Sequence, residues 1–226
     1  MPTAVVIANP EVGADLGHLG PWLQDNGFTV RRLVRDDVLD VSAADDADLL
    51  IILGSVWTMA RTMDAPDDPP QAAAAIAAEV ELVRHRAAQD QPTLGLCFGG
   101  QILSVALGGT VSRQDHTVMG WEVPATDIPE MRAPWMLLHE DQFTLPPNAE
   151  LLAEAEHAVV GFRYGRSWGV QFHPEVDADV LAKMFQDLGL PQWKWQQYVD
   201  AVSERAFENR IQARALFDRF WSEASA

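Results

Sequence analysis

The sequence predicts a doubly wound α/β fold in which a mostly parallel sheet carries a small antiparallel extension. Up to residue 109, short β-branched apolar runs alternate with helical patterns, which is typical of parallel strands buried on both faces. From residue 110 to 172, short alternating segments are separated by proline and glycine, which favours antiparallel strands. The 226 residues, 48% of them hydrophobic, are enough for one large domain with a sizeable core.

Each element of the first half has a local signal. The apolar runs are followed by turn-forming residues and read as strands, the alanine-rich run favours a helix, and glycines stop the helices. In chain order we expect a strand at 3–9, a helix at 18–27, strands at 28–34 and 48–55, a proline- and aspartate-rich loop at 56–70, a helix at 71–89, a strand at 93–97 and a helix at 99–109. Residues 169–173 predict a final central strand, and the chain is helical after Pro174.

The chain shows no internal repeat, no flexible linker and no domain boundary, so we expect a single domain over residues 1–226 with C-terminal helices at about 177–226. Aromatic and apolar residues recur on one face of these helices. They are Trp195, Tyr198 and Val202, followed by Phe217, Phe220 and Trp221. This face either packs on the chain's own domain or forms an interface for a partner or for a second copy in a homodimer.

Charge and composition exclude several classes of function. A net charge of −17 argues against a nucleic-acid partner and against binding to an anionic membrane surface. The start of the chain lacks a signal-peptide pattern, and no apolar run approaches the roughly 20 residues that span a bilayer. A single cysteine suits a reducing compartment, so we expect a cytoplasmic protein. No zinc-like spacing and no phosphate-binding loop occurs, so no metal or cofactor is predicted.

The single cysteine, Cys97, lies between a buried strand and a glycine-rich helix start in "GLCFGGQ". This order predicts a strand–turn–helix elbow, which exposes a nucleophile on a strained turn while glycines remove clashing side chains. The helix N-terminus favours the thiolate, and free backbone N–H groups there can hold an oxyanion. Alternatively, Cys97 is a small buried hydrophobic residue, which is the common role of a lone cysteine. To act as a nucleophile, the thiol would also need a base nearby.

A base is available in "GVQFHPEVD", where His173 ends the predicted strand and Glu175 follows two residues later. Alternate side chains of extended backbone share a face, so Glu175 can orient the imidazole, and Pro174 ends the strand ladder between them. The set would then be a thiolate, an acid/base imidazole and an orienting carboxylate. Alternatively, His173 is a surface histidine near an acidic helix start.

Together, "GLCFGGQ" and "QFHPE" resemble the paired motifs of the class I glutamine amidotransferases, in particular their free-standing members similar to the glutaminase of GMP synthase. The resemblance runs from the first strand to at least Glu175. It implies a flavodoxin-like three-layer α/β/α core and hydrolysis of the side-chain amide of glutamine through a γ-glutamyl thioester. It also implies that Cys97 is the nucleophile of a triad completed by His173 and Glu175.

The same resemblance implies further site residues. Gly54 and Ser55, in the loop after the third strand, and Phe98 would donate backbone N–H groups to the oxyanion, although Ser55 stands where the family has a second glycine. Gln101 would contact the bound amino acid. The residues His139, Glu140 and Asp141 match a family segment whose backbone helps to hold the α-amino and carboxylate groups of the substrate. Glu140 stands where the family usually has a glycine, so its side chain either alters the binding of these groups or points to solvent.

The resemblance implies a glutaminase that releases glutamate and ammonia for a separate synthetase chain, because about fifty residues after Glu175 are too few for an ATP-dependent synthetase domain. A second hypothesis is a peptidase or hydrolase that acts on another γ-glutamyl compound by the same chemistry. A third is a non-catalytic binding or regulatory protein with the same fold. The presence of all three triad residues argues against the third hypothesis.

Overall fold

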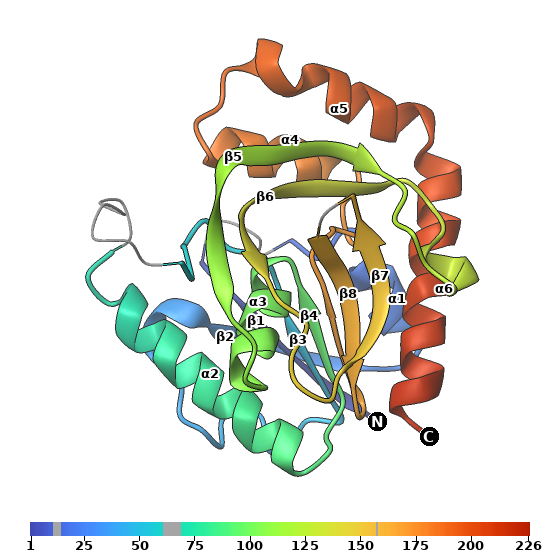
Figure 1. Cartoon of the computed structure of the whole chain (residues 1–226). Helices are drawn as coiled ribbons and strands as arrows, with labels where there is room; N and C mark the ends of the chain where they lie inside the picture. Colours follow the sequence, from blue (N-terminus) through green and yellow to red (C-terminus); the bar gives the residue numbers. More distant parts are fainter. Residues whose placement is uncertain (11–14, 61–68, 157) are drawn as a thin grey trace.

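The computed structural model describes residues 1–10, 15–60, 69–156 and 158–226. Its strands are β1 (Thr3–Ala8), β2 (Thr29–Val34), β3 (Leu49–Ile52), β4 (Thr93–Leu96), β5 (Val111–Glu122), β6 (Trp135–Phe143), β7 (Glu150–Ala155), β8 (Ala158–Tyr164) and β9 (Ser167–Val170). Within the described residues, the main sheet has seven strands in the order β2-β1-β3-β4-β9-β8-β7 (Figure 1). Pairing is parallel from β2 to β9, and β8 and β7 continue the sheet in antiparallel fashion.

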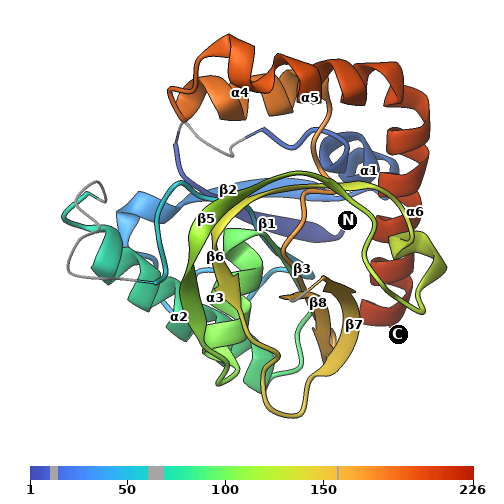
Figure 2. The same ribbon diagram turned by 45° about the horizontal axis from the view of Figure 1, so that its top comes forward.

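Helices cover both faces of this sheet (Figure 2). They are α1 (Leu19–Asp25), α2 (Ala72–Ala88), α3 (Phe98–Ala106), α4 (Ala178–Asp187), α5 (Gln192–Glu204) and α6 (Ala206–Ala224), with short 3-10 turns at Arg35–Asp37 and Pro129–Met131. Successive residues of β1 face opposite layers: Ala4 and Val6 pack with α1 and α6, whereas Val5 and Ile7 pack with α2 and α3. In the described part of the chain, no helix is both long and apolar enough to cross a bilayer.

The predicted three-layer α/β fold with a mostly parallel sheet is confirmed, and two details of the prediction are wrong. First, residues 110–172 do not all extend the main sheet, because β5 and β6 form a separate antiparallel pair. Second, His173 does not end a strand. The final strand stops at Val170, and the His173 N–H donates to the Met136 carbonyl at 2.9 Å. Most of the predicted loop at 56–70, residues 61–68, lies outside the described residues.

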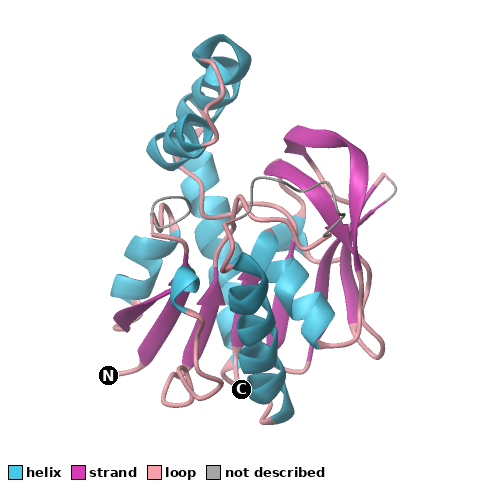
Figure 3. Ribbon diagram, turned by 90° about the vertical axis from the view of Figure 1, so that its left-hand side faces the viewer, coloured by secondary structure: helices cyan, strands magenta, loops and turns pink. Residues whose placement is uncertain are grey.

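The C-terminal helices pack on the chain itself. In Figure 1, α6 runs along the side of the sheet next to α1. There Phe217 contacts Trp22 with ring centroids 5.7 Å apart, and the Trp22 Nε1–H donates to Asp218 at 2.8 Å. In contrast, α4 and α5 stand out beyond the layers, beside the β5–β6 pair (Figure 3), where Trp195 and Val202 are buried. The apolar face predicted from the sequence is therefore largely internal.

Candidate active site

Cys97 occupies the elbow that the sequence predicts, between β4 and α3. Its backbone has a φ of 51°, which is strained for a residue with a Cβ, and Cys97 is the N-cap of α3. The neighbouring glycines allow very close packing: a Cβ at Gly95 would lie 2.4 Å from the Gly99 carbonyl oxygen, and a Cβ at Gly99 would lie 2.1 Å from that of Ile52. These contacts hold the first turn of α3 against the sheet and fix the position of the thiol.

Cys97 is 5% exposed, and its thiol faces two polar groups. Its Sγ lies 3.7 Å from the Leu138 carbonyl oxygen, and the Gln171 side-chain amide donates to Sγ at 3.5 Å. Sequence reasoning missed Gln171, although it is the first residue of the "QFHPE" motif and lies two positions before His173. An N–H donor pointed at sulfur stabilises negative charge there.

His173 and Glu175 lie beside the thiol, and both are almost fully buried. The His173 Nδ1 is 2.7 Å from Glu175 Oε1. A Cβ built on Gly54 would lie 3.2 Å from Cε1 of His173 and 3.9 Å from Cβ of Cys97, so the imidazole and the cysteine meet at the same point of the backbone. The structure thus brings together the three residues that the two sequence motifs supply.

The charges around His173 favour its protonated form. Burial lowers its pKa, but the Glu175 carboxylate and the Cys97 sulfur raise it more, so the pKa of His173 stands well above its ordinary value of 6.5. Its Nε2 has no hydrogen-bond partner among the described residues. This nitrogen is therefore available to a group that enters the site.

The loop after β3 is held from behind by a buried arginine that sequence reasoning missed. Arg35 donates to the carbonyl oxygens of Leu53 and Gly54 at 3.0 and 3.1 Å, and to Asn9 at 2.8 Å. It also forms a two-point ion pair with Glu79, and both side chains are 0% exposed. Because the carbonyl groups point back to Arg35, this part of the loop is fixed relative to Cys97.

The side chain of Ser55 holds the same loop through hydrogen bonds. Its hydroxyl donates to Asn9 Oδ1 at 2.7 Å and accepts from the Trp57 N–H at 3.1 Å. On the other side of the site, Phe98 is the first residue of α3, and the first N–H groups of a helix lack partners within the helix. The predicted N–H donors therefore belong to two segments next to Cys97, the loop after β3 and the start of α3.

Asp141 joins the predicted substrate-binding residues to the rest of the site. Its backbone carbonyl accepts from the Gln101 amide at 3.0 Å and lies 3.1 Å from His139 Nδ1. Its carboxylate accepts three further hydrogen bonds, from the hydroxyl of Thr58 and the N–H groups of Met59 and Ala60. Burial lowers the pKa of His139 to about 4, so this imidazole is neutral near pH 7.

Glu140 does not point freely to solvent. Its carboxylate pairs with Arg113 and accepts from the Thr117 hydroxyl at 2.7 Å. Arg113 also lies 3.5 Å from the buried carboxylate of Asp141. Glu140 and Arg113 are each a little over 40% exposed and line the same cavity as Cys97. A carboxylate and a guanidinium side by side match the opposite charges of an amino acid's α-ammonium and α-carboxylate groups.

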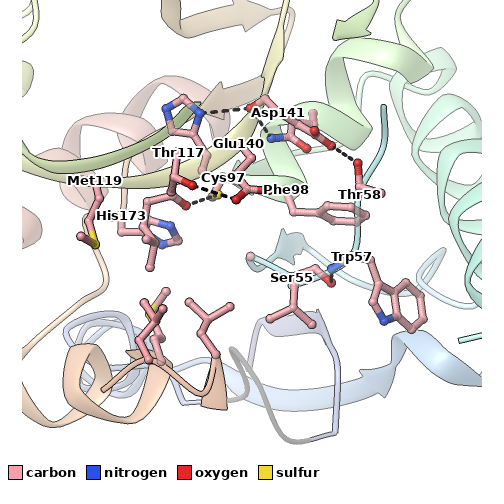
Figure 4. A pocket seen from close by; sticks show the side chains of 18 of the residues that line it. Ser55, Trp57, Thr58, Cys97, Phe98, Thr117, Met119, Glu140, Asp141 and His173 are labelled. Atoms are coloured by element: carbon pink, nitrogen blue, oxygen red, sulfur yellow. Dashed lines mark hydrogen bonds between the residues drawn. The ribbon is translucent and has the colours of Figure 1, made fainter. Parts of the chain in front are cut away.

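All site residues predicted from the sequence line one cavity of about 450 Å³. Figure 4 shows Cys97 near its centre, with His173 and Met119 on one side and Thr58 and Trp57 on the other. Among the described residues, no group of three or more histidine, cysteine, aspartate or glutamate side chains is arranged to hold a metal ion. The cavity combines a thiol, a buried imidazole–carboxylate pair and N–H donors, a set that suits acyl transfer.

The family model of the class I glutamine amidotransferases matches residues 30–188, more than half of the chain. The chain therefore belongs to this family. A relative described as GMP synthase (glutamine-hydrolyzing), from Thermus thermophilus, is 31% identical over 140 residues. That match includes 53% of this chain, which spans only 28% of the relative's length.

Solved structures show that the whole fold is shared. A glutamine amidotransferase from Thermotoga maritima superposes with a TM-score of 0.78 at 20% identity, over 97% of each chain. A glutamine amidotransferase from Methylobacillus flagellatus gives a TM-score of 0.74 at 22% identity, over 98% of this chain and 94% of the other. With 97% of this chain covered, the first of these matches includes α5 and α6, which lie beyond the region that the family model matches.

Proposed function

We propose that this protein is a glutaminase that hydrolyses the side-chain amide of glutamine through a γ-glutamyl thioester on Cys97. The observation that carries the proposal is the convergence of Cys97, His173 and Glu175 in one buried cavity. The raised pKa of His173 supports its role as the base that accepts the thiol proton, because the imidazolium then stabilises the thiolate beside it. Glu175 orients the ring and stabilises its positive charge.

In the first half of the reaction, the Cys97 thiolate attacks the amide carbon and forms a carbon–sulfur bond. The carbonyl oxygen becomes an oxyanion, which the N–H of Phe98 and the Gly54–Ser55 loop stabilise. The tetrahedral intermediate then collapses as His173 Nε2 gives its proton to the leaving nitrogen, the carbon–nitrogen bond breaks, and ammonia leaves.

In the second half, His173 takes a proton from water while the water oxygen attacks the thioester. The carbon–sulfur bond breaks, glutamate is released, and the thiolate–imidazolium pair is restored. We propose that the α-ammonium and α-carboxylate groups of the substrate bind at one end of the cavity. This end is formed by Gln101, His139, Glu140 and Asp141. No step of this mechanism calls for a metal or an organic cofactor.

We treat residues 1–226 as one domain whose ammonia serves a synthetase. The similarity to a GMP synthase described as glutamine-hydrolyzing supports this reading, since the name couples glutamine hydrolysis to synthesis. The second candidate is hydrolysis of another γ-glutamyl compound by the same thioester chemistry. It is favoured by the size of the cavity, which lies within the roughly 300–1,000 Å³ of pockets that enclose drug-sized ligands.

The test is glutamate release from glutamine by the purified protein and by the Cys97→Ala variant. We expect release by the wild type only, together with a mass increase on Cys97 when a glutamine analogue with an electrophilic ketone in place of the amide is added. Circular dichroism checks that the variant is folded. Glutamate release that persists in folded Cys97→Ala protein would contradict the proposal.

A further inference from the structure

The cavity at Cys97 continues past the imidazole of His173 into a region lined by apolar side chains. We call this region the apolar annex. It is lined by Met119, Leu138, Val180, Met184, Leu188 and Leu190. Figure 4 shows Met119 beside His173, on the side of Cys97 away from Thr58 and Trp57. The cavity lining also includes Asp15 and Lys194.

The annex exists because α4 and α5 use only part of their apolar surface for packing. Their buried residues, among them Phe185 and Trp195, form a core cluster with Met136 of β6. Met119, Leu138, Met184 and Leu190 sit at the margin of that cluster and are only half-buried, and Leu188 is 39% exposed. Apolar side chains that line a cavity and remain open to it gain from an apolar ligand.

The chemistry of the site gives the two ends different roles. The opposite end holds polar and charged side chains, including Gln101, His139, Glu140 and Arg113, and it suits the charged α-groups of a γ-glutamyl unit. His173 must deliver its proton to the leaving nitrogen, so that nitrogen has to lie next to the imidazole. Anything bonded to the nitrogen then enters the annex. Glutamine has only hydrogens there and would leave the annex unfilled.

We propose that the preferred substrate is a γ-glutamyl amide whose nitrogen carries an apolar group, and that this group binds in the annex. The inference rests on the proposed thioester mechanism and adds the class of leaving group. The Cys97 sulfur bonds to the acyl carbon, and the carbon–nitrogen bond then breaks as the tetrahedral intermediate collapses. The His173 proton goes to the nitrogen, and the product released first is a free apolar amine in place of ammonia. Water then releases glutamate from the thioester.

The experiment compares kcat/KM of the purified full chain for three probes: L-glutamine, γ-L-glutamyl isopentylamide and γ-L-glutamyl methoxyethylamide. The last two are both secondary amides of similar length, so they differ mainly in the polarity of the group that would enter the annex. We expect the isopentylamide to exceed both of the other probes by about 10-fold or more, the range that hydrophobic pockets give for a few methylene groups.

Two outcomes separate the inference from the proposed function. If glutamine is cleaved and the isopentylamide is cleaved no better than glutamine or the methoxyethylamide, the annex assignment is wrong while the glutaminase reading stands. If none of the three probes is cleaved and no Cys97 adduct forms, the proposed function fails and the inference fails with it.

Variants of the apolar annex test whether its side chains cause the preference for the isopentylamide over the methoxyethylamide. Met184→Ser and Leu188→Ser each place a hydroxyl in the annex and should lower the isopentylamide-to-methoxyethylamide ratio by about 5-fold or more. Ile211→Ser, at a 51% exposed position on α6, is the matched control and should leave the ratio unchanged. Leu188 is already exposed, so its variant should fold even if Met184→Ser does not. An unchanged ratio in folded Leu188→Ser and Met184→Ser proteins would overturn the proposal.

Discussion

The backbone of Gly54 lies directly against the ring of His173, and a Cβ at residue 54 would stand 3.2 Å from the ring atom Cε1. Because Glu175 and the surrounding core hold the ring, it has little room to move away. We expect Gly54→Ala to displace the imidazole by a few tenths of an ångström and to lower kcat by about 10- to 100-fold. Steady-state kinetics at several glutamine concentrations would measure this loss.

Gly20→Ala is the matched control, because a Cβ at Gly20 in α1 makes only an ordinary contact, 3.4 Å from Leu16. This variant should keep the wild-type kcat and gain about 0.5–1 kcal/mol of stability from its helical position. Equal kcat values for Gly54→Ala and the wild type would show that the ring does not need its observed place.

Glu175→Gln tests the electrostatics of the imidazole. The carboxylate of Glu175 helps to raise the pKa of His173 above 6.5, so its removal should lower that pKa and shift the alkaline limb of the kcat/KM profile to lower pH. A group with a raised folded-state pKa stabilises the fold below its unfolded pKa, and this stabilisation is lost as pH rises through the folded-state value.

The decrease in the free energy of unfolding that Glu175→Gln causes should therefore be largest at about pH 6 and should become smaller at alkaline pH. Urea denaturation across this range would measure it, with Glu81→Gln, an exposed glutamate on α2, as the control. A loss of stability that grows with pH would rule out the imidazolium–carboxylate pair as its source.

The buried pair of Arg35 and Glu79 should matter for both stability and catalysis. Arg35→Met alone leaves the Glu79 carboxylate buried without its partner, which costs about 3–5 kcal/mol. The double variant Arg35→Met/Glu79→Leu removes both charges and should regain most of that loss. It should still have a low kcat, because the Leu53 and Gly54 carbonyl groups have lost the donor that holds their loop. A stable double variant with full kcat would assign Arg35 a purely structural role.

His139 should make the fold sensitive to acid. Burial lowers its pKa from 6.5 to about 4, so between these values the unfolded chain takes up a proton that the folded chain does not. The stabilising contribution is present above pH 6.5 and is lost as the pH falls through about 4. His139→Gln should therefore show a smaller drop in Tm between pH 7 and pH 4.5 than the wild type. An equal drop in the two proteins would place the acid sensitivity elsewhere.

Local patterns were sufficient for the parallel core and for the position of Cys97. The runs that became β1, β3 and β4 are largely apolar because both faces of these strands are covered, and the glycines around Cys97 are needed where α3 approaches the sheet. The partition of the antiparallel strands could not be predicted. Alternation and turn residues show that β5 and β6 are strands, but they do not show which sheet the strands join.

The residues that support the site were harder to predict than those that face the cavity. Arg35 belongs to the charged run "RRLVRDD", which by itself looks exposed, and only the pairing of β1 with β2 and β3 places it behind Gly54. Asp141 was predicted through its backbone, whereas its carboxylate binds the Thr58–Ala60 segment. Such roles depend on contacts between distant parts of the chain, which no short motif records.

The contact of Trp22 with Phe217 and Asp218 also constrains how the protein can mature during translation. The indole and its hydrogen-bond acceptor are 196 positions apart, so at roughly 5–20 residues per second a ribosome needs about 10–40 s to deliver the second after the first. Throughout that interval, the aromatic surface around Trp22 is exposed on the nascent chain, because α6, which covers it in the folded protein, has not yet been synthesised.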